Sequence, residues 1–405
     1  METLSDFEIV LVSSGHQATD HRVFHKEAVS LAKYFNQVRV VAAHTGEGEI
    51  ERVRITTLSR CRNRLERFAW RPFQCFWAAR GPGKRMLILH DAELLFWAPL
   101  VKLCTGWRII YDVHEDFPQL MLRRSWIPSS LRQGISNSIA LLERCCSLAC
   151  DGIIGVTEVL ADAFHHRRRT AIYNLPSRSF ITEAATKSRP LADREYALVH
   201  LGTLSEERME FLCEILAMLW QRQPDARVLI VGVRPDQELT LKQRLPAEQA
   251  TVIGKIDYQH VAELLGSACI GLDIHPILYP HLRCAVPVKV FEYMAAGCNV
   301  VTSYLPELHR LLGSEGAEHV VTITTPSVER FCDEIIRLLK DPESMALHRA
   351  ALMQLVSERW NWEHEESILV DFVSHILAGK QWVPDTQRVA HQFFQQQLPE
   401  GKSSK

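Results

Sequence analysis

The stretch VPVKVFEYMAAGCNVV, residues 286–301, joins a helical pattern to a buried-strand pattern. Pro287 suits a first helical turn, because its missing N–H would have no partner there anyway. Gly297 is of the residue type that most often ends a helix. The apolar run that follows lacks the alternation of a half-exposed strand, so it predicts a strand covered on both faces. A helix that leads straight into such a strand is typical of an α/β sheet.

Two charged residues interrupt this apolar stretch. Lys289 and Glu292 are three residues apart, so they share one face of the predicted helix. The free N–H groups of the first turn can hold an anion, beside a lysine and with a carboxylate one turn deeper. These features predict a nucleoside diphosphate site, with Glu292 on the ribose diol. The alternative is an intrahelical Lys–Glu pair at an exposed edge, worth a few tenths of a kcal/mol.

Similar apolar runs recur along the chain, with helical patterns between them. Helices between buried strands imply right-handed crossovers and parallel sheets. This alternation of apolar runs and helical patterns is interrupted by the polar stretch 177–195, which we interpret as a linker, and then continues. The pattern therefore predicts two doubly wound α/β domains in tandem. The expected strands are 7–14, 38–43, 85–90, 107–115, 151–157 and 171–176 before the linker, and 196–202, 226–232, 250–254, 269–275, 298–303 and 319–324 after it.

Composition and motifs narrow the class of protein. The 405 residues include 48 acidic and 46 basic side chains, so no bulk charge attracts nucleic acid. The loop after the first strand, SSGHQATDHR (13–22), lacks GxGxxG, which argues against a nicotinamide enzyme. The chain contains no P-loop, GxSxG or HExxH motif. Because ligands of doubly wound sheets bind beyond the carboxyl ends of the strands, we expect an active site in a cleft between the two domains.

The cysteines and the first residues indicate a cytoplasmic protein. The eleven cysteines form no CxxC or zinc-finger spacing, and we interpret Cys145, Cys146 and Cys150 as buried thiols in a reducing compartment. The start of the chain is acidic where a signal peptide is basic. No window approaches the roughly 18 apolar residues of a membrane span.

Several segments together resemble retaining glycosyltransferases of the GT-B fold, family 4 (group 1). The resemblance covers roughly residues 5–375, and residues 286–303 carry its most specific motif. Other matching segments are DHRVFHKEAVSLAKYFNQVRVV (20–41), YDVHEDFP (111–118) and HLGTLSEERMEFLCEIL (200–216). The domains expected from pattern and resemblance are an acceptor-side domain (1–180), a linker (181–195), a nucleotide-sugar domain (196–360), a helix crossing back to the first domain (361–379) and a loosely held tail (380–405).

The resemblance implies donor-binding residues. Glu292 corresponds to the glutamate that grips the ribose, and Arg208 and Lys289 would contact the diphosphate. Gly15 would approach the donor phosphates, and the loop around Ile256 would contact the base.

The chain departs from the family pattern at three positions. Met209 replaces the glycine after the basic residue, and Thr203 replaces a second basic residue. Cys284 replaces the first glutamate of the E-x7-E motif, which contacts the transferred sugar. His281, Arg283 or the backbone after Pro287 would have to replace that carboxylate.

Acceptor-side candidates follow the first strands of the chain. The resemblance implies His114 as a catalytic residue that orients the acceptor or the sugar, with Glu115 and Asp112 beside it. The further candidates are His16, Asp20, Arg22, His90 and Asp91. Asp20 could instead cap a helix, and Arg22 could form a surface ion pair.

The implied reaction is transfer of a sugar from a UDP- or GDP-sugar, with retention at the anomeric carbon. Arg208, Lys289 and a helix N-terminus would stabilise the leaving diphosphate, so no metal and no cofactor is expected. The expected acceptor is a saccharide or lipid-linked saccharide of cell-surface polysaccharide assembly. The alternatives are a non-catalytic, transferase-like partner protein and a nucleotide-sugar 2-epimerase.

The segment 59–85 carries eight basic residues, one acid and five interleaved aromatic residues. Such a segment favours an anionic membrane surface. The alternative is an ordinary solvated helix whose aromatic rings lie in the core. The first interpretation predicts a peripheral protein on the inner face of the cytoplasmic membrane.

Overall fold

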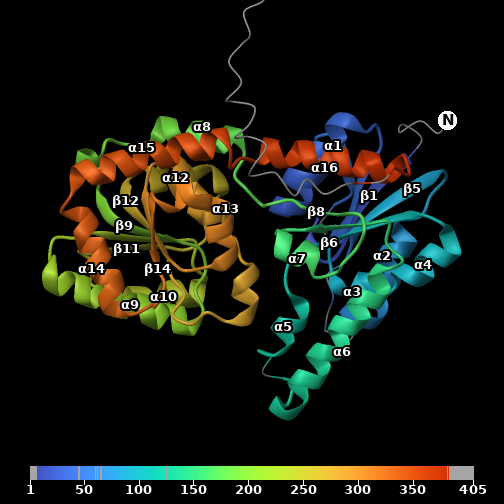
Figure 1. The fold of residues 1–405 in the computed structure, drawn as a ribbon, viewed down its shortest axis with the longest axis horizontal. Helices are drawn as coiled ribbons and strands as arrows, with labels where there is room; N and C mark the ends of the chain where they lie inside the picture. The colour runs from blue at the N-terminus through green and yellow to red at the C-terminus, as the bar shows by residue number, and fades with distance from the viewer. Residues whose placement is uncertain are drawn as a thin grey trace, which may run out of the picture. The chain divides into compact units, whose positions relative to one another are not determined.

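The computed structural model describes residues 7–43, 46–59, 61, 63, 66–124, 126–380 and 382. Contacts divide the chain into two compact units (Figure 1). Unit 1 comprises residues 1–114, 139–171 and 370–405, and unit 2 comprises residues 115–138 and 172–369. Each unit is built around its own sheet.

Unit 1 contains an eight-stranded sheet with the order β3-β4-β2-β1-β5-β6-β7-β8. All neighbouring strands are parallel except the pair β3 and β4. The central strands are buried on both faces, as their continuous apolar runs predict. The strands are β1 (Phe7–Gln17), β2 (Val38–Ala43), β3 (Gly48–Ile50), β4 (Val53–Leu58), β5 (Lys84–Leu89), β6 (Arg108–Val113), β7 (Gly152–Gly155) and β8 (Arg169–Ala171).

Helices cover both faces of this sheet (Figure 1). One face carries α1 and the end of α16, where Phe372 and Ile376 lie directly over Gly152. The other face carries α2 and α4. The helical segments are η2 (His21–Ala28, π-helical), α1 (Val29–Tyr34), η3 (Glu66–Trp70), α2 (Arg71–Ala78), α3 (Ala92–Leu95), α4 (Ala98–Thr105), α6 (Ser129–Ser147), α7 (Glu158–Asp162) and α16 (Trp362–Leu377). The boundary between the two units falls within α6 and within α16, so each of these helices belongs partly to unit 1 and partly to unit 2.

Unit 2 contains a parallel six-stranded sheet with the order β11-β10-β9-β12-β13-β14. Its core consists of apolar side chains from these strands and from α9 and α14. The strands are β9 (Tyr196–Leu201), β10 (Val228–Val231), β11 (Ala250–Ile253), β12 (Ala268–Asp273), β13 (Asn299–Ser303) and β14 (Val320–Ile323).

The helices of unit 2 form two layers. In Figure 1, α9, α10 and α14 lie on one face of the sheet, and α8, α12 and α15 lie on the other. The helical segments are α5 (Phe117–Met121), α8 (Arg178–Lys187), η4 (Leu191–Asp193), α9 (Glu206–Arg222), α10 (Pro235–Arg244), η5 (Tyr258–His260), α11 (Val261–Gly266), η6 (Pro280–Cys284), α12 (Val288–Ala295), α13 (Pro306–Ala317), α14 (Val328–Leu339) and α15 (Pro342–Glu358).

The structure corrects three predictions from the sequence. The polar stretch interpreted as a linker contains α8, whose residues Phe180, Ile181 and Ala184 are buried. The expected strand 171–176 lies earlier in the chain, as β8. Cys145 is exposed and Cys146 half-buried, so only Cys150 of that group is a buried thiol. The hairpin of β3 and β4 was not predicted, because β3 is three exposed residues long and carries no apolar signal.

Among the residues that the structure describes, none of the helices has the length and apolar character needed to cross a bilayer.

Candidate functional site

Two cations meet at the carboxyl end of β12 in unit 2. Arg208 lies in the first turn of α9, which begins after the N-cap Ser205, and Lys289 lies in the first turn of α12. Lys289 Nζ is 2.7 Å from Asp273 Oδ1, and Arg208 Nη2 is 3.6 Å from the same oxygen. Arg208 Nε donates to the carbonyl of Ile274 at 2.7 Å. The strand end and two helix N-termini thus place both predicted phosphate ligands around one buried carboxylate.

The net charge of this cluster is positive, which favours binding of an anion. Asp273 supplies one negative charge against two positive charges of Arg208 and Lys289, and His275 Nε2 lies 3.3 Å from Asp273 Oδ2. Burial alone would raise the pKa of Asp273, but Lys289, His275 and Arg208 hold it well below its usual value. Burial lowers the pKa of Lys289, and Asp273 opposes that shift. A bound phosphate would add the missing negative charge.

Glu292 and Lys289 bind different partners. Tyr258 Oη donates to Glu292 Oε1 at 2.8 Å, and the Tyr258 ring stacks on Phe180 of α8 at 5.1 Å. Glu292 is buried. The alternative prediction of an exposed intrahelical Lys–Glu pair is therefore wrong, because each side chain has a partner outside α12.

Tyr293 fixes α12 against the sheet. Its ring lies over Gly271, where an added Cβ would come within 2.3 Å of the ring. Its hydroxyl donates to the carbonyl of Leu272 at 3.1 Å and accepts from the N–H of Leu201 at 2.8 Å. These bonds connect α12 to β12 and β9, so they set the depth of Lys289 and Glu292 beside the strand ends.

The residues at which the chain departs from the family pattern, and those near them, lie in different environments. Met209 packs against the core of unit 2, where the pattern has glycine. Cys284 ends η6 and is buried, which raises the pKa of its thiol to about 11. His281 stacks on Tyr279 at 5.9 Å. Thr203 is exposed, and Ile256 is half-buried in the loop after β11.

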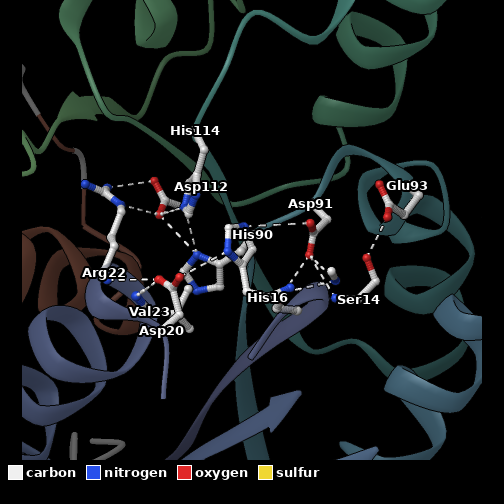
Figure 2. Close-up of polar contacts among 12 residues, drawn as sticks. Ser14, His16, Asp20, Arg22, Val23, His90, Asp91, Glu93, Asp112 and His114 are labelled. Carbon is white, nitrogen blue, oxygen red and sulfur yellow. Dashed lines mark hydrogen bonds and ion pairs between the residues drawn. The ribbon is translucent and has the colours of Figure 1, made fainter. Parts of the chain in front are cut away.

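Unit 1 holds a second cluster, at the carboxyl ends of β5 and β6 (Figure 2). Arg22 Nε and Nη2 donate to the two oxygens of Asp112 at 3.1 and 3.0 Å. Arg22 Nε is also 2.8 Å from Glu27 Oε1. All three side chains are buried, so the alternative prediction of a surface ion pair for Arg22 is wrong.

Two histidines converge on the same aspartate. Asp112 Oδ2 is 3.1 Å from His90 Nδ1 and 2.8 Å from His114 Nε2, and the two nitrogens are 3.2 Å apart. His90 is buried, which lowers its pKa. His114 is partly exposed, and its ring lies 5.3 Å from that of His16.

Asp20 caps η2, as its alternative prediction states. Its Oδ1 accepts from the N–H of Arg22 at 2.9 Å and of Val23 at 3.1 Å (Figure 2). His16 Nδ1 lies 3.3 Å from Asp20 Oδ2, and this hydrogen bond raises the pKa of His16. Asp20 thus connects the start of η2 to His16 near the end of β1.

Asp91 holds the end of β1. Its Oδ2 accepts from Ser13 Oγ at 2.7 Å, from the N–H of Ser14 at 2.8 Å and from the N–H of Gly15 at 3.3 Å. Arg67 is 3.2 Å from its other oxygen. Gly15 therefore packs against Asp91. The remaining candidate, Glu115, is exposed and belongs to unit 2.

The structure gathers the predicted residues into two groups. Arg208, Lys289 and Glu292 are on the helices around β12, and His16, Asp20, Arg22, His90, Asp91 and His114 surround Asp112 and the end of β1. Sequence reasoning missed Asp273, Tyr258 and Glu27. Asp273 could have been found, because a carboxylate that ends an otherwise apolar strand is the signal already used for Asp91.

Comparison with known proteins gives a partial family match. A model described as Glycosyl transferases group 1 matches residues 195–341, which include Arg208, Lys289 and Glu292. The match covers little more than a third of the chain. None of the curated proteins compared matches.

Solved structures match almost the whole chain. Sucrose-phosphate synthase from Thermosynechococcus elongatus has a TM-score of 0.70 and 15% identity, covering 92% of this chain and 100% of that one. HepE from Anabaena, solved with UDP-glucose, has a TM-score of 0.65 and 12% identity, covering 91% and 99%. A trehalose-6-phosphate synthase has a TM-score of 0.64 and 12% identity, with the same coverage. The chain has the GT-B fold. The fold class predicted from the sequence is confirmed, and identities this low carry no further conclusion.

Proposed function

We propose that this GT-B chain is a retaining glycosyltransferase of family 4 that uses a UDP- or GDP-sugar. The observation that carries the proposal is the pair of cations around Asp273, at two helix N-termini, with Glu292 one turn deeper in α12. This combination fits a diphosphate and a ribose. The group 1 model spans the same residues, and HepE, a structural neighbour, was solved with UDP and with UDP-glucose.

The cations would act on the leaving group. As the bond to the sugar breaks, negative charge grows on the diphosphate, and Arg208 and Lys289 are held where they can stabilise it. The phosphate would replace Asp273 as the principal partner of Lys289. Because these cations neutralise the charge, the donor step needs no metal and no cofactor. In the retaining mechanism the acceptor attacks from the leaving-group face, and a phosphate oxygen takes its proton.

His114 would orient the acceptor or the sugar. Its ring is held by Asp112, which is itself fixed by Nε and Nη2 of Arg22. The acceptor we propose is a saccharide or lipid-linked saccharide of cell-surface polysaccharide synthesis.

Exposed aromatic residues on unit 1 support peripheral membrane binding. Trp70 is 55% exposed, Phe73 41% and Trp77 60%, whereas Phe76 is buried. The guanidinium of Arg80 lies over the Trp77 ring at 4.4 Å. The alternative prediction, that the aromatic residues of 59–85 lie in the core, is wrong for these three and for Phe68, which is 41% exposed. On this support we propose that the protein binds the cytoplasmic face of an anionic membrane.

Nucleotide binding tests the proposal first. Calorimetry would measure UDP and GDP binding to the wild type and to Glu292→Ala. We expect micromolar binding of one nucleotide and at least a tenfold loss in the variant, about 1.4 kcal/mol, because the ribose loses its acceptor. The preferred nucleotide also identifies the base of the donor.

The exposed Glu263→Ala is a matched control, and it should bind the nucleotide like the wild type. If neither nucleotide binds, other nucleotides are tested once. Failure of all of them would leave Lys289 and Glu292 as structural residues and favour a non-catalytic partner protein. Conversion of the donor to an epimer without acceptor would instead indicate a 2-epimerase.

A further inference from the structure

Three potential metal ligands lie at the carboxyl ends of β5 and β6 in unit 1. His90 Nδ1, Asp112 Oδ2 and His114 Nε2 are separated by 3.1, 2.8 and 3.2 Å. Tetrahedral zinc holds its ligand atoms about 3.3 Å apart, because Zn–N and Zn–O bonds are about 2.0–2.1 Å long. One cation could therefore bond to all three atoms with little movement of the side chains.

More nitrogens surround Asp112 Oδ2 than this oxygen can accept hydrogen bonds from. Asp112 Oδ2 faces three nitrogens, which belong to Arg22, His90 and His114, at 3.1, 3.1 and 2.8 Å. A carboxylate oxygen offers about two lone-pair sites. The two imidazole nitrogens also face each other. A cation between them would use the lone pairs of both neutral rings, whereas Arg22 would still hold the other oxygen of Asp112.

The residues behind His90 suit a metal ligand. His90 is fully buried, its Nε2 has no hydrogen-bond partner, and Glu27 Oε2 lies 3.7 Å from that nitrogen. A metal on Nδ1 requires the proton on Nε2, where it would face this carboxylate. Such carboxylate–histidine–metal arrangements are common around metal ligands.

We propose that His90, Asp112 and His114 form a binding site for a transition-metal cation. Zn²⁺ fits two imidazoles and one carboxylate best, and Mg²⁺ fits them poorly because it prefers oxygen ligands. His114 is the partly exposed member, so the cation would enter from its side. Water or an oxygen atom of a ligand would complete the coordination. Its ligands belong to unit 1, whereas the cations proposed to hold the donor belong to unit 2.

Metal titration tests this site without reference to enzymatic activity. The full-length protein would be treated with EDTA, freed of chelator, and titrated with Zn²⁺ by calorimetry and with Co²⁺ by visible absorption. We expect one strong site per chain, the absorption bands of four- or five-coordinate Co²⁺, and no binding of Mg²⁺. His114→Gln should weaken Zn²⁺ binding at least tenfold, and His90→Gln should do the same if it folds.

A second histidine pair provides the control. His319 Nδ1 and His348 Nδ1 are 3.0 Å apart in unit 2 and could bind Zn²⁺ weakly. His348→Gln should leave the strong site unchanged. The proposal is overturned if His348→Gln removes the strong site, if His114→Gln leaves it intact, or if the wild type binds no Zn²⁺. In the last case, the three residues form a hydrogen-bonded cluster only.

Discussion

Asp273 shows how one buried residue organises a site. It lies between Lys289, His275 and Arg208, which are cations or can become cations, and the Thr302 hydroxyl donates a further hydrogen bond to it at 3.4 Å. Removing one partner of a buried pair leaves an uncompensated charge, which typically costs about 3–5 kcal/mol. Asp273 therefore acts on the proposed donor site by positioning, since it keeps two long cationic side chains at the strand end before any phosphate arrives.

His200 predicts a dependence of stability on pH. This residue of β9 is fully buried, and burial together with Lys289 and Arg208 holds its pKa well below the ordinary value. Below about pH 6.5 the unfolded chain protonates this histidine and the folded chain does not. The unfolded state then binds more protons, so stability falls as pH falls, by up to about 1.4 kcal/mol per pH unit for this residue.

Urea unfolding of the wild type and of His200→Leu at about pH 7, 6 and 5 would measure this effect. The variant should lose less stability than the wild type on acidification. The difference between their slopes should correspond to the one proton that the unfolded wild type binds at His200. The exposed His260→Asn should retain the wild-type slope. Equal slopes for wild type and His200→Leu would show that His200 does not carry the effect.

At the scale of elements, α2 together with Trp70, the last residue of η3, differs from an ordinary surface helix. The rings of Trp70 and Phe73 are 5.0 Å apart, and those of Phe73 and Trp77 are 6.0 Å apart, so the exposed rings form a continuous strip. Phe73 and Trp77 also line a hollow of about 380 Å³ together with β4 residues Thr57 and Leu58. An aromatic strip with a basic neighbour suits the interface of an anionic bilayer.

Vesicle binding tests the role of α2. Co-sedimentation with phosphatidylglycerol-containing vesicles should detect binding that falls as salt rises, since charge contributes to it. The double variant Trp70→Ala, Trp77→Ala should bind at least tenfold more weakly. Trp126→Ala removes an equally exposed tryptophan of unit 2 and should have no effect. Equal binding by the double variant, or equal binding to neutral vesicles, would contradict the membrane role.

At the scale of the whole molecule, the two units carry different chemistry. Unit 2 has the cations and the carboxylate suited to a nucleotide, and unit 1 has the histidine–aspartate cluster. Whether nucleotide binding requires a metal ion therefore tests the role of the cations in unit 2. Because Arg208 and Lys289 supply the positive charge at the proposed donor site, the nucleotide should bind without a divalent ion.

Calorimetry in EDTA and in Mg²⁺ checks this expectation. We expect UDP or GDP affinity to change less than twofold between the two conditions, and Lys289→Gln to reduce it at least tenfold in both. The exposed Lys242→Gln is the control. A strong requirement for Mg²⁺ would contradict metal-independent donor binding, without bearing on the zinc site proposed in unit 1.

Much of the fold could be predicted from local pattern. Continuous apolar runs identified almost all parallel strands, because strands covered by helices on both faces cannot alternate with polar residues. The pattern missed the hairpin of β3 and β4 and placed β8 too late in the chain. It also missed α8, whose buried face consists of few residues in a polar stretch. Arg208, Lys289 and Glu292 were predicted because they belong to specific motifs.

The sequence by itself thus determined the fold class, the approximate positions of most strands and the residue types available for the proposed nucleotide site. Only the tertiary structure decided the partners of those residues. Lys289 pairs with Asp273 rather than with Glu292, and Arg22 pairs with the distant Asp112, because parallel strands bring residues far apart in the chain to one sheet edge. Residue spacing describes one helix or strand at a time, whereas burial and charge depend on which elements become neighbours.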